Sequence, residues 1–180
     1  MGYAYLSSPA RQSAGMWTGG TAASWLELAP APAVSTISFG HFIGSGGASQ
    51  GGQWVPVGST NGRACWWSGT AASFTSLHPA TGFIRSSVTC VTPGQQWGWV
   101  QDANFLSRAS VWTGTAASRV DFHPAVATSS VINASDGTRQ AGFVTFANNI
   151  ANACVWNGSA NNAFNYHPGG TYSSSIFAIH

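Results

Sequence analysis

The sequence contains no lysine and few charged residues of any kind. Only 6% of its 180 residues are charged, against roughly 25% in an ordinary soluble domain. Without lysine, neither Schiff-base chemistry nor a lysine-bearing phosphate loop is possible. A formal net charge of +2 supplies no basic stripe, so we expect no nucleic-acid partner. The acidic residues, too few to favour an acid–base pair or a calcium site, are Glu27, Asp102, Asp121 and Asp136.

Long apolar runs and a secretory signal are also lacking. No run of about 18 apolar residues occurs, so we expect no contact with a membrane. The first residues have neither the basic nor the apolar region of a signal peptide, which predicts a cytoplasmic protein or a module of an exported one. Three cysteines without C-x-x-C spacing predict small buried apolar residues rather than disulfides or a zinc site. We expect no metal and no cofactor.

Aromatic residues, in contrast, are abundant, and the chain repeats itself. Nine Trp and ten Phe exclude a disordered chain. Residues 112–118 read Trp-Thr-Gly-Thr-Ala-Ala-Ser. Residues 67–73 repeat this motif with Ser in place of the first Thr, residues 17–24 carry it with an inserted Gly, and residues 156–162 hold a degenerate copy. The copies begin about 45 residues apart, a period typical of stacked structural units.

A second landmark follows each copy of this motif. A large apolar residue precedes a His-Pro pair at His78, His123 and His167, whereas the first unit has Ala29 in place of the histidine. Each unit holds four strand-length apolar segments separated by turn-forming residues. In the third unit they lie near 85–91, 96–101, 108–113 and 118–123. No segment has the apolar period of a helix, so we expect almost no helix.

Four short strands in each of four units predict an all-β fold, and more specifically a β-propeller of four four-stranded blades. We expect one domain over residues 1–180. Its units cover residues 172–180 with 1–30, then 34–79, 85–124 and 128–168. Because the first unit is split between the two termini, the C-terminal strand should complete a blade with the N-terminal strands and hide two sheet edges. The recurring Trp should anchor neighbouring blades.

The sequence leaves the closing of the ring open. Four units could close as one ring in a monomer, which we favour at this stage. Two chains could instead combine their units into a ring of eight blades.

One stretch also resembles a known family. It runs from residues 108–114 (Arg-Ala-Ser-Val-Trp-Thr-Gly) through 120–122 (Val-Asp-Phe) and 131–137 (Val-Ile-Asn-Ala-Ser-Asp-Gly) to Gly142. It is similar to the bacterial extracellular HAF repeat, and the similarity extends over all four units in degenerate form. The resemblance implies β-propeller-like repeats in surface or exported proteins, with no settled activity. The chain departs from the family in its His-Pro pairs and in the three units that lack the aspartate.

Two sets of residues are candidates for binding. The recurring His78, His123 and His167 could ligate a metal or bind sugar hydroxyls, but as ends of separate outer strands they are expected to lie apart and to have a structural role. The loops between second and third strands combine amides with aromatic rings, which suits weak sugar binding. Their candidate residues are Asn61, Asp102, Asn104, Phe105, Phe146, Asn148 and Asn149.

These observations lead to two hypotheses about function. The first is a non-catalytic binding module that uses one loop face, with repeated sites suited to multivalent binding of a glycan or to a protein partner. The second is a purely structural repeat scaffold, either a propeller fragment or an engineered assembly. An enzyme is not expected, because the sequence offers no convergent catalytic group.

Overall fold

The computed structural model describes residues 2–7, 10–29, 35–43 and 48–180, with the backbone alone for residue 10 and residues 35–43. Within these residues the fold is all-β, and helix is confined to three single turns of 3-10 helix. The predicted all-β class and the near absence of helix are therefore confirmed. Residues 30–34, at the predicted boundary between the first two units, lie outside the described residues.

The strands form four antiparallel groups, which we call sheets 1 to 4. Sheet 1 contains β1 (Gly2–Ser7), β2 (Ala10–Trp17) and β3 (Trp25–Glu27). Sheet 2 contains β4 (Ser35–Ile43), β5 (Gln50–Pro56), β6 (Arg63–Trp67) and β7 (Thr75–Ser76). Sheet 3 contains β8 (Arg85–Thr92), β9 (Gln95–Gln101), β10 (Ser107–Trp112) and β11 (Val120–Asp121). Sheet 4 contains β12 (Ser129–Ser135), β13 (Gln140–Thr145), β14 (Ala151–Trp156) and β15 (Ala163–Asn165).

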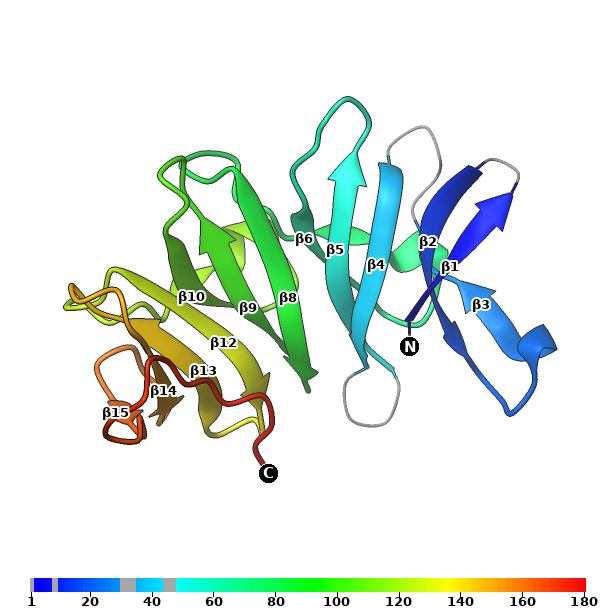
Figure 1. Cartoon of the computed structure of the whole chain (residues 1–180). Coiled ribbons are helices and arrows are strands. Elements are labelled where there is room, and N and C mark those ends of the chain that lie inside the picture. Colours follow the sequence, from blue (N-terminus) through cyan, green and yellow to red (C-terminus); the bar gives the residue numbers. More distant parts are fainter. Residues whose placement is uncertain (1, 8–9, 30–34, 44–47) are drawn as a thin grey trace.

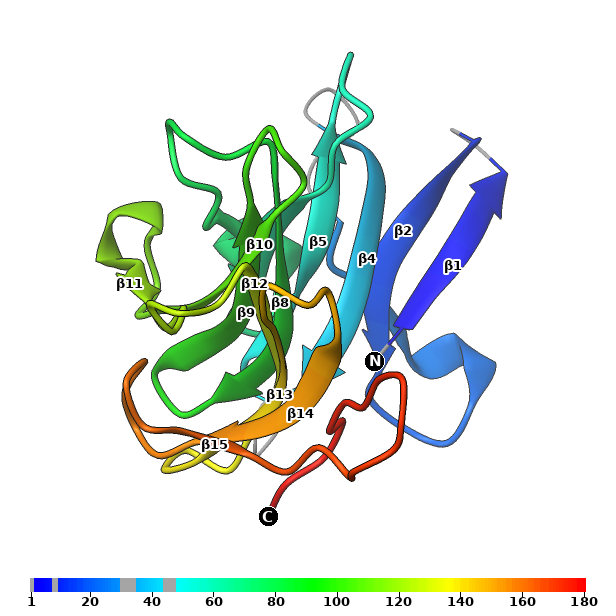
Figure 2. The same ribbon diagram turned by 60° about the vertical axis from the view of Figure 1, so that its left-hand side comes forward.

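The four sheets lie along an arc, with β1 at one end and β15 at the other (Figure 1). Strands in each sheet follow chain order. Sheets 1 and 2 are joined by one parallel bridge between Gln12 of β2 and Ile37 of β4, which makes them a single seven-stranded sheet. Figure 2 shows the same fan of strands from the side of sheet 4.

Apolar cores fill the spaces between successive sheets. Leu28 and Trp67 belong to the cluster between sheets 1 and 2, and Leu77 and Trp112 belong to the next. The largest cluster lies between sheets 3 and 4 and includes Trp156. The repeating Trp of sheets 2, 3 and 4 is completely buried, so the expected role of these Trp side chains as anchors between sheets holds for three of the four units.

The motif Gly-Thr-Ala-Ala-Ser forms the turn between the third and fourth strands. Gly114 has a φ of 90°, in the left-handed region that glycine tolerates, and a 3-10 turn follows at Ala116–Ser118. The Ser118 hydroxyl donates to the Thr115 carbonyl at 2.7 Å and accepts the Thr113 N–H at 2.8 Å. In the second unit Ser73 makes the same bonds. The residues that repeat most faithfully therefore hold a turn.

The C-terminal segment, residues 173–180, differs from the expectation that it pairs with the N-terminal strands. It forms no strand, and β1 pairs only with β2 within the described residues. Sheet 4 holds the segment instead, because the Ser174 N–H donates to the Ala151 carbonyl and the Ile176 N–H to the Gly142 carbonyl. The blade that the terminal strands were expected to complete is thus not formed in this arrangement.

Candidate functional site

The strand register brings both sets of candidate residues to one end of the sheets. In sheet 3, Arg85 at the start of β8 pairs with Gln101 at the end of β9, which pairs with Ser107 at the start of β10. The loop after β9 and the connector before β8 therefore lie at the same end. Sheet 4 has the same register, with Ser129 opposite Thr145. We call this end, which carries the candidate loops and the His-Pro connectors, the loop end (Figure 1).

Each of the three histidines contacts a serine rather than another histidine, and these serines lie in β8, in β12 and in the C-terminal segment. Their Nδ1 atoms lie 2.7–2.8 Å from the Oγ atoms of Ser86, Ser130 and Ser174, respectively. The Nε2 atom of His123 lies 3.0 Å from the Ala127 carbonyl, so this nitrogen carries the proton. Within the described residues no three His, Cys, Asp or Glu side chains gather as a metal site.

The surroundings of His78 and His123 favour the neutral imidazole. Burial lowers the pKa of His123 below its ordinary value, and the positive charge of Arg108 lowers it further. Burial and Arg63 act in the same way on the pKa of His78. Ser86 and Ser130 are fully buried, so these Ser–His pairs connect sheets and cannot present a nucleophile to a substrate.

The polar side chains of the candidate loops largely hold their own turns. The Asp102 carboxylate accepts the N–H groups of Asn104 and Leu106 at 2.9 and 3.0 Å. The Asn148 amide oxygen accepts the Ile150 N–H at 3.1 Å, and the Asn61 oxygen accepts from the Arg85 guanidinium at 2.9 Å.

Two other candidates share an unusual backbone. Phe105 and Asn149 occupy the same position in their loops, with positive φ values of 62° and 58°. Asn adopts this conformation readily, whereas for Phe it is strained. The Phe105 ring is 64% exposed, so it is presented to solvent at the loop end. Asn104 and Asn149 are exposed beside these turns.

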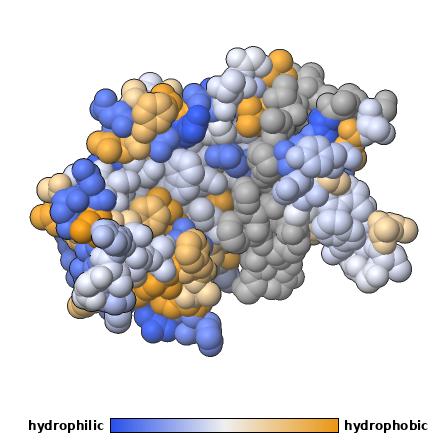
Figure 3. Space-filling view, in the orientation of Figure 1, coloured by the Kyte–Doolittle hydropathy of each residue, from blue (hydrophilic) through white to orange (hydrophobic). Residues whose placement is uncertain are grey.

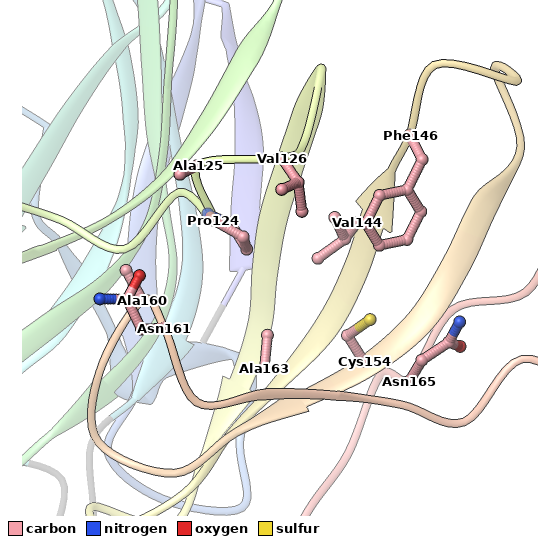
Figure 4. A pocket seen from close by; sticks show the side chains of 10 residues that line it. All are labelled: Pro124, Ala125, Val126, Val144, Phe146, Cys154, Ala160, Asn161, Ala163 and Asn165. Carbon is pink, nitrogen blue, oxygen red and sulfur yellow. The ribbon is translucent and has the colours of Figure 1, made fainter.

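One of the candidate residues, Phe146, lines a pocket. The pocket has a volume of about 310 Å³ and lies between the connector after His123 and the outer strands of sheet 4 (Figure 4). Its lining residues are Pro124, Ala125, Val126, Val144, Phe146, Cys154, Ala160, Asn161, Ala163 and Asn165.

One missing side chain explains why this pocket exists. The residue in register with the repeating Trp is Trp25 in sheet 1 and Ala163 in sheet 4. In sheet 3 the register of β10 with β11 gives this position to Arg119. The Arg119 guanidinium lies 4.7 Å from the centre of the Phe83 ring, which comes from the preceding connector.

At the next interface both partners of this contact are small. Ala127, whose carbonyl contacts the histidine as the Phe83 carbonyl does, packs against the same apolar cluster as Ala163. The space that Arg119 and Phe83 fill between sheets 2 and 3 is therefore open between sheets 3 and 4.

The pocket is neutral and mostly apolar. None of its ten lining residues is charged, and its polar side chains are the amides of Asn161 and Asn165 and the Cys154 thiol. The Asn165 oxygen accepts the backbone N–H of His167 at 2.7 Å, so this oxygen is already engaged within the protein. Burial raises the pKa of Cys154 to about 11, so the thiol stays protonated near neutral pH and lacks a thiolate's reactivity.

The sequence contains a signal for this pocket in its departures from the repeat. The degenerate copy of the turn motif, residues 156–162, has Asn161 where the other copies have Ala, and the copy is followed by Ala163. Departures from a repeat therefore marked the site, whereas our predicted residues followed the repeat and included only Phe146.

Comparisons with known proteins add no relative. No protein-family model matches the chain, and neither a curated protein nor a solved structure matches it. In the described part of the chain, no helix is long and apolar enough to cross a membrane.

Proposed function

We propose that the four sheets are blades of a β-propeller and that the protein is a non-catalytic binding module. Three successive sheet-to-sheet interfaces use the same Trp anchor and lie along an arc (Figure 1), as adjacent blades of a propeller do. The resemblance to HAF repeats supports the same architecture. The binding site is the pocket between sheets 3 and 4, and its ligand is a neutral glycan residue.

A single observation carries this proposal. The pocket occurs where Ala163 replaces the large residue of the other units, beside a degenerate turn that contributes Asn161. A purely structural repeat has no need for a hollow in this interface, because closing it with larger side chains would add packing energy.

The chemistry of the walls favours a sugar. Phe146 and Val126 supply apolar surface for the C–H face of a sugar ring, and the amides of Asn161 and Asn165 supply hydrogen bonds for its hydroxyls. The absence of charge among the lining residues disfavours acidic sugars and phosphate groups. The Asp102 carboxylate and the Asn61 amide oxygen of the other sheets already accept hydrogen bonds, which favours one pocket over a series of equivalent sites.

A glycan-array screen followed by calorimetry with the best ligand tests this proposal. The variant Ala163→Arg should fill the pocket as Arg119 fills the equivalent space, and it should weaken binding at least about tenfold. The matched control is Phe105→Ala, which removes an exposed aromatic ring from a candidate loop outside the pocket. Wild-type affinity in Ala163→Arg with lost binding in Phe105→Ala would contradict the pocket and favour repeated loop sites.

The scaffold hypothesis is the second candidate. It is supported by the turn motif and by the Ser–His pairs, because the most regular features of the chain all hold the fold together. On this hypothesis the array shows no ligand, and Ala163→Arg raises the melting temperature because it adds packing without loss of function.

A further inference from the structure

One position in each unit makes an identical backbone contact but differs sharply in exposure in sheet 4. The N–H groups of Leu28, Leu77, Phe122 and Tyr166 each donate to a carbonyl of the preceding strand at 2.8 Å. The first three side chains are buried, at 0%, 0% and 7% exposed, whereas Tyr166 is 61% exposed. The difference therefore comes from what lies against the sheet and not from the local backbone.

The partner of this position is the repeating Trp of the next sheet. Leu28 packs in one cluster with Trp67, Leu77 with Trp112, and Phe122 with Trp156. These three Trp side chains are completely buried, whereas Trp17 of sheet 1 is 48% exposed. Among the described residues no further sheet packs against Tyr166 or Trp17, so the two side chains correspond to the two halves of a contact that is made three times elsewhere.

The C-terminal segment occupies the place of the first strand of such a following sheet. The Ser174 hydroxyl contacts His167 at 2.7 Å and accepts the Ala153 N–H at 2.8 Å. Ser86 makes the same two contacts with His78 and Ala64, at 2.8 and 2.7 Å. Residues 173–180 therefore take the position of a first strand, but no further strands of a sheet follow them among the described residues. Sheet 1, in contrast, has no strand in the corresponding first position within the described residues.

The exposed surface beside this segment is apolar. A hollow of about 490 Å³ is lined by Val155, Phe164, Tyr166, Ile176, Ala178 and Ile179, together with Arg139 and Asn157. Figure 3 shows hydrophobic residues gathered on the part of the surface where sheet 4 and the C-terminal segment lie. In sheets 3 and 4, the residues two positions after the anchoring serine, Val88 and Ile132, are completely buried, whereas their counterpart Ile176 lines this open hollow.

We propose that the end face of sheet 4 and its C-terminal segment bind sheet 1 of a second copy of this chain. Trp17 of one chain would then pack on Tyr166 of the other, and residues 173–180 would lie along the edge of β1 that faces away from β2. Two copies related by a two-fold axis satisfy both end faces of each chain and close a ring of eight sheets. This inference rests on the propeller arrangement proposed above and is independent of the pocket.

The internal packing favours a second copy over closure within one chain. β1 and β15 lie at the two ends of the arc, and the C-terminal segment runs back from β15 along sheet 4 (Figure 1). Bringing the two ends together would change the angles between sheets at interfaces where Trp67, Trp112 and Trp156 are fully buried, and close-packed interfaces resist such changes. A second copy fills both end faces while leaving those interfaces intact.

Light scattering coupled to size-exclusion chromatography tests the proposal. The wild-type protein should have about twice the chain mass of 18.6 kDa, and both Trp17→Arg and Tyr166→Arg should return it to a single chain. The matched control is Val120→Arg, because Val120 is 54% exposed on an outer strand of sheet 3 and lies away from both end faces. It should keep the doubled mass.

A mixing experiment identifies the paired faces. Trp17→Arg and Tyr166→Arg chains, each a single chain alone, should form mixed pairs, because the intact sheet 4 of the first meets the intact sheet 1 of the second. A wild-type mass of one chain, or a mass that rises continuously with concentration, would overturn the two-chain ring. A doubled mass that neither variant reduces would overturn the assignment of these faces. None of these results affects ligand binding in the pocket, which tests the function separately.

Discussion

The Nδ1 atom of His123 lies 2.8 Å from the Oγ atom of Ser130, and this contact joins the end of one sheet to the first strand of the next. The serine hydroxyl also accepts the Ala109 N–H at 3.0 Å, and the opposite ring nitrogen donates to the Ala127 carbonyl. A buried backbone donor, a hydroxyl, an imidazole and a carbonyl thus form one continuous chain of hydrogen bonds. The contact between His123 and Ser130 accounts for the recurrence of a histidine at the end of one unit and of a serine at the start of the next strand.

Replacing Ser130 with Ala should destabilise the protein by about 1–3 kcal/mol, because the buried Ala109 N–H and the His123 Nδ1 atom both lose their partner. Urea unfolding followed by tryptophan fluorescence measures this change. Thr113→Ala is the control: Thr113 is exposed in a turn, and its loss should change stability by less than about 0.5 kcal/mol. Equal effects of the two substitutions would show that the buried chain of hydrogen bonds contributes nothing.

Stability should fall as the pH is lowered below the ordinary histidine range. Burial lowers the pKa of His78 and His123 in the folded state below the ordinary histidine value, so the unfolded chain binds more protons in this window. The stabilisation is therefore complete above about pH 6.5 and is lost as the pH falls toward the folded-state pKa values. Unfolding free energies measured between about pH 7.5 and 5 should show this slope. It should be shallower in His123→Gln and unchanged in His180→Gln, because His180 is exposed.

Replacing a repeating Trp with Ala should greatly reduce the free energy of unfolding. Trp112 is completely buried, and its indole N–H has no hydrogen-bond partner among the described residues, so we attribute its contribution to packing. Trp112→Ala should destabilise by about 3–5 kcal/mol, whereas Val120→Ala on the exposed outer strand should cost less than about 0.5 kcal/mol. Unchanged melting of Trp112→Ala with lost ligand binding would instead assign Trp112 to a binding site.

The close approach of two strands in sheet 4 depends on Gly142. A Cβ atom at this position would lie 2.0 Å from the Val131 carbonyl oxygen on the neighbouring strand, so Gly142→Ala must displace the backbone. We expect a loss of about 3 kcal/mol or more. Gly158→Ala is the matched control: its φ is 73° but nothing lies near an added Cβ, and it should cost about 1 kcal/mol. Similar losses in thermal unfolding would contradict the role of the close approach.

Much of the strand pattern could be predicted from the sequence because β-strands are bounded by local turn residues. The predicted segments at 85–91 and 96–101 correspond to β8 (Arg85–Thr92) and β9 (Gln95–Gln101). The fourth predicted segment, 118–123, was too long. Ser118 closes a 3-10 turn on Thr115, which leaves only the two residues of β11 for the strand.

The candidate site was harder to predict, because the pocket depends on an absent side chain. Ala163 carries no chemical signal by itself, and its meaning appears only when the register aligns it with Arg119 and Trp25. The position of residues 173–180 could not be predicted from their local sequence either. Their serine-led pattern identifies a first strand but does not say which sheet provides its neighbours.

The offset contact between each histidine and the serine of the next unit has a consequence for how such a chain can change length. Deleting residues from Pro79 to His123 would place Ser130 in the position of Ser86, where His78 and Ala64 offer the partners that His123 and Ala109 offer now. The new junction would bury Trp156 against Leu77 in place of Trp112. Units can therefore be gained or lost by recombination without leaving an orphaned donor or an unmatched aromatic ring at the junction.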